Sequence, residues 1–152
     1  MRTILRSAAF GAMLAGLLAP AAGVAQSLDT PIGLWKNIDD ETKQPKALIR
    51  IVEQGGALVG RIEKILTDKA DAVCEKCSDD RKGKPLVGME ILRAVRKTDG
   101  HDHWDGGTIL DAAEGKVYKV RMTPADGGKK LDVRGYVGMP MLGRTQTWIR
   151  IE

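Results

Sequence analysis

Two histidines and a carboxylate stand close together at His101, His103 and Asp105. Alternate side chains of a β-strand share one face, so on a strand these three groups could converge. Two imidazoles and one carboxylate are a ligand set that suits a transition metal. However, the preceding Asp99-Gly100 pair is a turn signal, which favours an exposed hairpin tip. We therefore predict a solvated turn at this place and no metal site.

Cys74 and Cys77 have the C-x-x-C spacing of thioredoxin-type redox pairs and of zinc sites. Redox catalysis needs the first cysteine at a helix N-terminus within a β-α-β unit, where its pKa falls. The neighbouring residues lack that pattern. In an oxidising compartment the two cysteines are expected to form a disulfide. Because the closed loop is short, we place its contribution to stability at the low end of about 0–5 kcal/mol.

Nucleophilic hydrolysis has no candidate set of residues. Beyond residue 25 the serines are Ser27 and Ser78, no G-x-S-x-G motif occurs, and both histidines lie in one turn. The paired carboxylates Asp39-Asp40 and Asp79-Asp80 have lysines nearby, which indicates solvated surface. The sequence thus leans away from an enzyme without excluding one. It implies no cofactor.

The chain begins with the features of a secretory signal peptide. Arg2 and Arg6 precede an uncharged run over residues 8–22, and small residues follow over 23–25. We expect cleavage after Ala25 and export to the periplasm, leaving residues 26–152 as a single β-barrel domain. The alternative is an uncleaved N-terminal anchor. No second apolar stretch follows, so no stable membrane span is expected after cleavage.

The net charge of +4 includes both leader arginines, so the exported part is only weakly basic. Acidic and basic residues alternate along it and form no basic stripe. Nucleic acid, which requires clustered phosphate contacts, is therefore a poor candidate partner. A membrane-surface role driven by charge has the same weakness. The sequence identifies no protein partner.

Short segments with alternating apolar and polar residues fill most of the exported chain, and turn signals recur between them, which is typical of an all-β fold. The connections are mostly too short for crossover helices, so neighbouring strands should pair antiparallel. The predicted strands cover residues 33–37, 47–53, 58–63, 87–97, 104–110, 118–122, 131–136 and 144–151.

An eight-stranded antiparallel up-and-down barrel is the first choice of fold, because closing the sheet removes its exposed edges. A two-sheet sandwich is the alternative. The glycines predicted within strands, Gly60, Gly88 and Gly135, favour the tight coiling of a small barrel. One long connection over residues 67–85 holds both cysteines. We predict that it lies over one mouth of the barrel as a lid, the alternative being a solvated excursion.

Several segments resemble a known family in their order and spacing. They are residues 31–36 (PIGLWK), the cysteine loop, 106–111 (GGTILD), 131–136 (LDVRGY) and 143–148 (GRTQTW). Together they resemble an uncharacterised exported bacterial family known as domain of unknown function 2147. The resemblance spans residues 26–152, but it implies no catalytic residues because the family has no assigned activity.

Gly33-Leu34-Trp35 also resembles the G-x-W start of lipocalin-like barrels. In those proteins the tryptophan plugs the closed end, and an arginine of the last strand lies over its ring. The resemblance implies structural roles for Gly33 and Trp35, with Arg150 or Arg144 over the ring. Such a cation–π contact contributes about 0.5–2 kcal/mol.

An eight-stranded barrel is either filled by its own side chains or holds one small ligand, and the sequence leaves this choice open. Few aromatic rings are available to fill the interior. Aliphatic side chains with some methionine suit an elongated apolar guest. The residues predicted to line a cavity are Met89, Ile91, Tyr118, Val120, Met122, Leu131 and Val133, with Arg144 as a candidate for a polar head group.

These residues predict a periplasmic binding or carrier protein for a small hydrophobic molecule. The alternative from another class is an envelope interaction module without a ligand, in which the barrel is packed and its surface or lid loop binds a protein. A hydrolase or isomerase ranks third.

Overall fold

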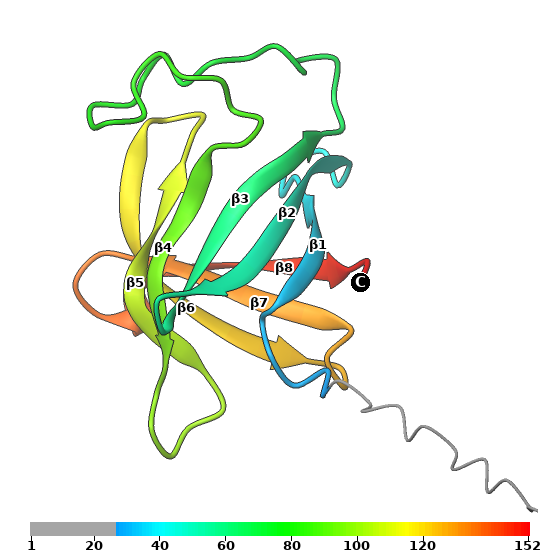
Figure 1. The fold of residues 1–152 in the computed structure, drawn as a ribbon, viewed down its shortest axis with the longest axis vertical. Coiled ribbons are helices and arrows are strands. Elements are labelled where there is room, and N and C mark those ends of the chain that lie inside the picture. The colour runs from blue at the N-terminus through cyan, green and yellow to red at the C-terminus, as the bar shows by residue number, and fades with distance from the viewer. Residues whose placement is uncertain (1–26) are drawn as a thin grey trace, which may run out of the picture.

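The computed structural model describes residues 27–152, so the leader and its cleavage site lie outside the described residues. Eight antiparallel strands follow one another around a closed barrel, each hydrogen-bonded to the next, and β8 pairs with β1 (Figure 1). The strands are β1 Gly33–Ile38, β2 Pro45–Gln54, β3 Ala57–Ile65, β4 Glu90–Lys97, β5 Trp104–Asp111, β6 Lys116–Ala125, β7 Lys130–Tyr136 and β8 Arg144–Arg150. This confirms the predicted all-β, up-and-down barrel, and the sandwich alternative is wrong.

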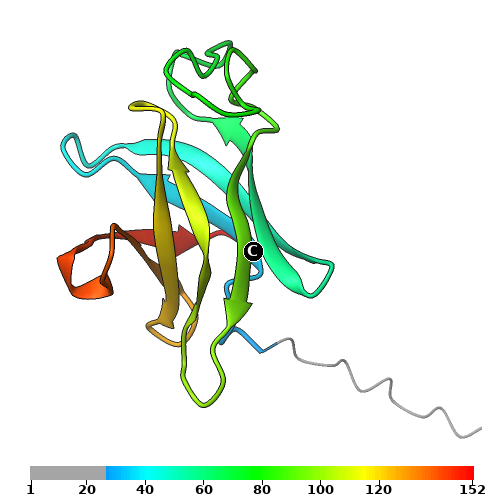
Figure 2. The same ribbon diagram turned by 90° about the vertical axis from the view of Figure 1, so that its left-hand side faces the viewer.

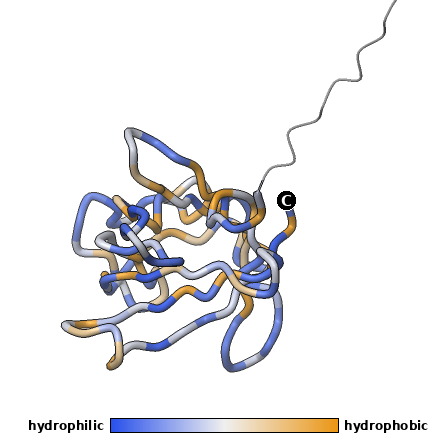
Figure 3. The backbone as a smooth tube through the Cα atoms, turned by 90° about the horizontal axis from the view of Figure 1, so that it is seen from below, coloured by the Kyte–Doolittle hydropathy of each residue, from blue (hydrophilic) through white to orange (hydrophobic). Residues whose placement is uncertain are grey.

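The alternation of apolar and polar residues produces the barrel because it gives each strand an inner and an outer face. In β2, Ala47, Ile49 and Ile51 are buried, while the residues between them are partly exposed. In β3, Leu58 and Ile62 are buried on the face that also carries Gly60. Figure 3 shows hydrophobic and hydrophilic residues interleaved along the tube. No helix within residues 27–152 is long and apolar enough to span a membrane.

Two glycines allow close contact between neighbouring strands. A Cβ atom on Gly60 of β3 would lie 2.7 Å from Leu92 Cδ1 of β4. On Gly107 of β5 it would lie 2.2 Å from the carbonyl oxygen of Arg93. The prediction that Gly88 is an in-strand glycine is wrong. It has φ of +84°, and β4 begins after it, at Glu90, because this backbone turns rather than extends.

The connection between β3 and β4 carries the disulfide joining Cys74 and Cys77, with an S–S distance of 2.00 Å. Both cysteines are fully buried. An isolated bridge between Val73 and Pro85 closes the base of this cysteine loop. Figures 1 and 2 show the loop, in green, folded over one end of the barrel. The predicted disulfide is confirmed.

Candidate functional site

The barrel contains a cavity of about 1240 Å³ at the end covered by the cysteine loop. Four connections contribute to its wall, those between β1 and β2, β3 and β4, β5 and β6, and β7 and β8. This volume exceeds the ~300–1000 Å³ of most small-molecule sites, so the cavity has room for a guest of ordinary ligand size.

Apolar side chains from strands spread around the barrel line the inner part of the cavity. They include Ile49, Ile62, Ile91, Ile109, Val133 and Trp148. Ile49 of β2 and Ile62 of β3 are register partners, so their side chains lie side by side on the inner face of the barrel. Tyr118 and Tyr136 add two further rings to this wall. A surface of this kind can take up an apolar molecule by excluding water, and it would discriminate weakly among such molecules.

The predicted lining residues divide into two groups. Ile91, Tyr118, Val133 and Arg144 lie on the cavity. The other four, Met89, Val120, Met122 and Leu131, lie in the packed core instead.

Depth along the barrel explains this division for the residues of β6, although Met89 lies beside Ile62 of the cavity wall. Tyr118 and Met122 have the same parity on β6, but Met122 lies nearer the β6–β7 turn and is fully buried. The barrel is therefore hollow toward its covered end and filled toward the other. Sequence reasoning missed Ile49 and Ile62, although the alternation in their strands was a usable signal. It also missed Gln146 and Trp148 of β8, whose register was ambiguous.

The ladder between β1 and β8 is short. Within the described residues it joins Trp35 to Arg150 and Lys36 to Ile149. Figure 2 shows the two strands, blue and red, meeting near the C-terminus and separating beyond it. The described parts of β1 and β8 form no further backbone pairs toward the cavity. There the gap between the two strands, which we call the seam, can be closed only by side chains.

Polar side chains close this part of the seam. Asn37 Nδ2 donates a hydrogen bond to Gln146 Oε1 at 3.0 Å, and Gln146 Nε2 donates to Asp40 Oδ2 at 2.9 Å. Arg144 Nη2 lies 2.8 Å from the same Asp40 oxygen. Asn37, Arg144 and Gln146 also line the cavity. These groups can bind the polar end of a guest, because hydrogen bonds between side chains can be exchanged for bonds to a ligand.

The opposite end of the barrel is closed around Trp35, which is fully buried. The Arg150 guanidinium carbon lies 4.2 Å from the centre of a Trp35 ring. Trp35 Nε1 donates to the carbonyl oxygen of Pro31 at 2.7 Å. Gly33, with φ of +142°, has no room for a side chain, because a Cβ atom would lie 2.6 Å from Arg150 Nη1. The tryptophan ring thus occupies the closed end, and the cavity lies toward the other end.

Arg150 also ties three segments together. Its guanidinium donates to carbonyl oxygens of Leu28 and Thr30 at 3.1 and 2.6 Å, and to that of Ile32 at 2.8 Å. It also donates to the carbonyl oxygen of Gly128 in the β6–β7 turn. A further bond joins it to the carbonyl oxygen of Glu152, the last residue, at 3.3 Å. Burial lowers the pKa of this guanidinium from its usual value.

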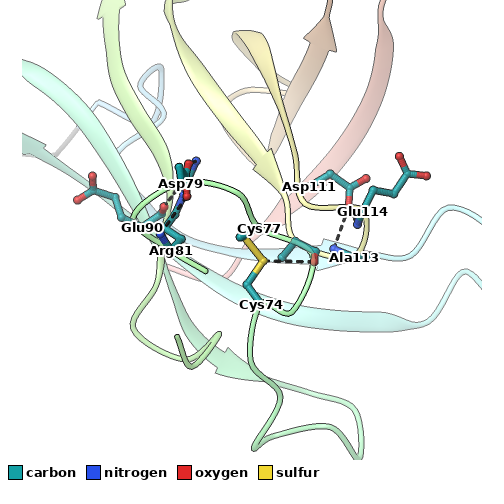
Figure 4. Close-up of a disulfide and its surroundings, with 9 residues drawn as sticks. Cys74, Cys77, Asp79, Arg81, Glu90, Asp111, Ala113 and Glu114 are labelled. Carbon is teal, nitrogen blue, oxygen red and sulfur yellow. Dashed lines mark hydrogen bonds and ion pairs between the residues drawn. A yellow bond between two sulfur atoms is a disulfide. The ribbon is translucent and has the colours of Figure 1, made fainter. Parts of the chain in front are cut away.

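The cysteine loop is held against the barrel on two sides (Figure 4). On one side the Cys74 sulfur lies 3.6 Å from the carbonyl oxygen of Ala112 in the β5–β6 connection. Gly115 of the same connection lies very close to the cysteine loop. A Cβ atom on Gly115 would be 2.0 Å from the carbonyl oxygen of Lys76. A side chain at Gly115 would therefore push the loop away from the barrel.

On the other side buried Arg81 pairs with Asp79 at 2.6 Å and donates to the carbonyl oxygen of Glu90 at 3.0 Å. Asp80 pairs with Arg93 of β4 at 2.8 Å. Hydrogen bonds from Arg93 lower the pKa of Asp80 from 3.8 to about 2. The sequence interpretation of Asp79-Asp80 as simply solvated surface misses this role. Asp80 therefore anchors the loop to β4 directly, and Asp79 orients the arginine that bonds to Glu90.

His101 and His103 lie on the β4–β5 connection, with ring centres 5.1 Å apart. Asp105 accepts from Arg121 and Thr98, each at 2.9 Å, and its Oδ2 lies 3.4 Å from His103 Nε2. Burial and the neighbouring Arg121 lower the pKa of His103. Among residues 27–152 no group of three or more histidine, cysteine or acidic side chains is arranged to hold a metal ion. His103, Asp105 and Arg121 form a connected set of charge pairs.

Comparisons with known proteins place this barrel among solved folds. Protein HP1028 from Helicobacter pylori, described as belonging to the lipocalin family, matches with a TM-score of 0.69 and 17% sequence identity. The match covers 80% of this chain and 82% of that chain. At this identity the likeness concerns the fold alone, which is the lipocalin-like barrel expected from the G-x-W start. Curated proteins give no match.

One family model matches residues 33–150, from the first residue of β1 to the last residue of β8. Its description is "Uncharacterized protein conserved in bacteria (DUF2147)". The match covers the whole barrel, including the cysteine loop and both ends of the cavity, and it confirms the resemblance seen in the sequence motifs. The chain therefore belongs to the DUF2147 family.

Proposed function

We propose that this protein binds a small apolar molecule reversibly inside the barrel and carries it in the periplasm. The observation that supports this most is the cavity of about 1240 Å³, with aliphatic walls and polar groups at one side. The likeness of the barrel to a lipocalin-family structure agrees with ligand binding. The leader-like residues 1–25 support export.

The proposed guest is elongated and amphiphilic. Its apolar part would lie against Ile49, Ile62 and Trp148, where burial contributes about 25 cal/mol per Å² of apolar area. Its polar end would meet Gln146 and Arg144 at the seam. Both side chains donate to Asp40 Oδ2, so a ligand that accepts one of these hydrogen bonds leaves few groups unpaired.

A cavity-filling variant tests the proposal. Gly135 of β7 lines the cavity, and a Cβ atom there would meet Tyr118 and Ile109 at 3.6 and 3.7 Å, which is ordinary contact. Gly135→Leu should therefore fold and should occupy guest space. Lys119→Leu adds the same side chain at an exposed position of neighbouring β6 and serves as the matched control.

The assay uses the neutral fluorescent probe N-phenyl-1-naphthylamine, competed by saturated fatty acids of increasing length. The wild type and Lys119→Leu should bind the probe, and Gly135→Leu should bind it about tenfold more weakly or worse, a loss of about 1.4 kcal/mol. Equal affinities for all three proteins would refute binding in the cavity. Failure of the wild type to bind any probe, with no adduct in native mass spectra, would favour the envelope interaction module.

A further inference from the structure

The connection between β7 and β8 exposes the most apolar surface of the described chain. Val137 and Met139 are 71% and 58% exposed, and Met141 and Leu142 are 74% and 76% exposed. Every other exposed large apolar side chain among residues 27–152 is 47% exposed or less. We call residues 137–142 the apolar tip. Four such side chains in one connection are a surface that water solvates poorly, which marks an interaction site.

The apolar tip has no polar side chain of its own. Residues 137–143 read Val-Gly-Met-Pro-Met-Leu-Gly, without an ionisable or hydrogen-bonding side chain. The tip is also continuous with the cavity, because Val137 and Leu142 belong to the cavity wall. An apolar molecule leaving the cavity past these residues would therefore meet a further apolar surface.

The backbone of the apolar tip has internal hydrogen-bond partners. The N–H of Leu142 donates to the carbonyl oxygen of Met139 at 3.1 Å, within a short 3-10 turn over Pro140–Leu142. Arg134 donates to the carbonyl oxygens of Pro140 and Met141, the latter at 3.2 Å. Backbone groups without partners are costly to transfer into lipid, so this pairing lowers the cost of moving the tip out of water.

Two arginines flank the apolar tip in the sequence, Arg134 and Arg144. The Arg144 side chain is 73% exposed, although it also pairs with Asp40 at 2.8 Å. Arginines at the base of an apolar projection can reach lipid phosphates while the apolar residues insert. A stable protein interface involves about 20–30 residues a side, far more than one connection provides. The small size of the tip therefore favours a lipid surface over a protein partner, and the two flanking arginines suit lipid phosphates.

We propose that the apolar tip docks this protein on a phospholipid bilayer, inserting Met139, Met141 and Leu142 into the interfacial region. The mouth of the cavity then faces the membrane, which is the source or the destination of an apolar guest. The docking step rests on the tip alone. The exchange of a guest with the bilayer also rests on the proposed function.

The test is co-flotation of the full protein with vesicles of phosphatidylglycerol and phosphatidylethanolamine. The double variant Met139→Asp with Met141→Asp should bind vesicles at least about 100-fold more weakly, because two apolar side chains that would insert into the bilayer are replaced by charges. Both side chains are exposed and lie outside the cavity wall, so the cavity itself is unchanged. The control Leu28→Asp with Ile151→Asp introduces the same charges at side chains that are 47% and 46% exposed, away from the tip. It should bind like the wild type.

Three outcomes count against docking. Absence of wild-type flotation, or equal flotation of the tip variant, would overturn it. A wild-type dimer that the tip variant dissociates, without vesicle binding, would assign the tip to contact between copies of the chain. Thermal unfolding and probe binding of the tip variant should match the wild type, which shows that it is folded. Vesicle binding by a wild type that binds no probe would overturn the carrier proposal and leave docking intact.

Discussion

We expect Arg150→Met to lower the free energy of unfolding more than the replacement of any other partly exposed charged residue of the barrel. Methionine keeps the length of the side chain but removes the guanidinium that lies over Trp35. It also removes the donor for five carbonyl oxygens in three segments. The N-terminal segment before β1 and the β6–β7 turn would lose their common attachment.

The magnitude follows from which contacts are shielded from water. The bonds to Gly128 and Thr30 are partly buried, and each contributes about 1–1.5 kcal/mol. The three exposed bonds count for little, because water replaces them. The contact with Trp35 adds about 1 kcal/mol. The free energy of unfolding should thus fall by about 3–4 kcal/mol.

Urea unfolding followed by tryptophan fluorescence and far-UV circular dichroism measures this loss. Arg150→Lys keeps a cation over the ring but cannot reach all five oxygens, so it should lose an intermediate amount. Arg50→Met removes an arginine of the outer surface that pairs with Glu63 at 2.7 Å, and it should cost less than about 1 kcal/mol. If Arg150→Met costs no more than Arg50→Met, the reasoning about the closed end is wrong.

Three further predictions concern the loop and the strands. Because the pKa of Asp80 falls from 3.8 to about 2 on folding, its pairing with Arg93 stabilises the protein above pH 4 and is lost as the pH falls toward 2. The stability difference between the wild type and Asp80→Asn, measured by urea unfolding, should therefore disappear over that range, and a constant difference would contradict the pairing. Reducing the disulfide should lower stability by about 2 kcal/mol, measured by thermal unfolding, while the far-UV spectrum stays that of a barrel; loss of the barrel spectrum would give the bridge a larger role. Gly107→Ala should cost about 1–3 kcal/mol by forcing β4 and β5 apart, whereas Gly135→Ala, whose Cβ meets only ordinary contacts, should change stability little; equal unfolding midpoints would contradict the steric argument.

The residues along the chain were enough to predict the strands and their order. The alternation at Leu58, Gly60 and Ile62 set the faces of β3, and the Gly55-Gly56 turn set its beginning, because both are local properties of the backbone. Short connections then made neighbouring strands antiparallel. The strand boundaries differ by a few residues, most clearly at Val87, where a positive φ at Gly88 delays β4 until Glu90.

The candidate site could be predicted only in part. Alternation told which side chains point inward, so Ile91, Tyr118 and Val133 were found on the cavity. It did not tell how deep along the axis each residue lies. Val120 and Leu131 point inward as well but are packed where the barrel is filled.

The sequence by itself determined the strand pattern, the disulfide and the family, because these depend on neighbouring residues and on motif order. The tertiary structure alone decided that the barrel is hollow at one end, and it brought together Asn37 and Gln146, which are 109 residues apart. It also decided that the residues of the apolar tip stay exposed rather than packed inside. The physical reason is that depth, seam closure and exposure depend on how eight strands tilt and close around one axis, and local alternation carries no information about that closure.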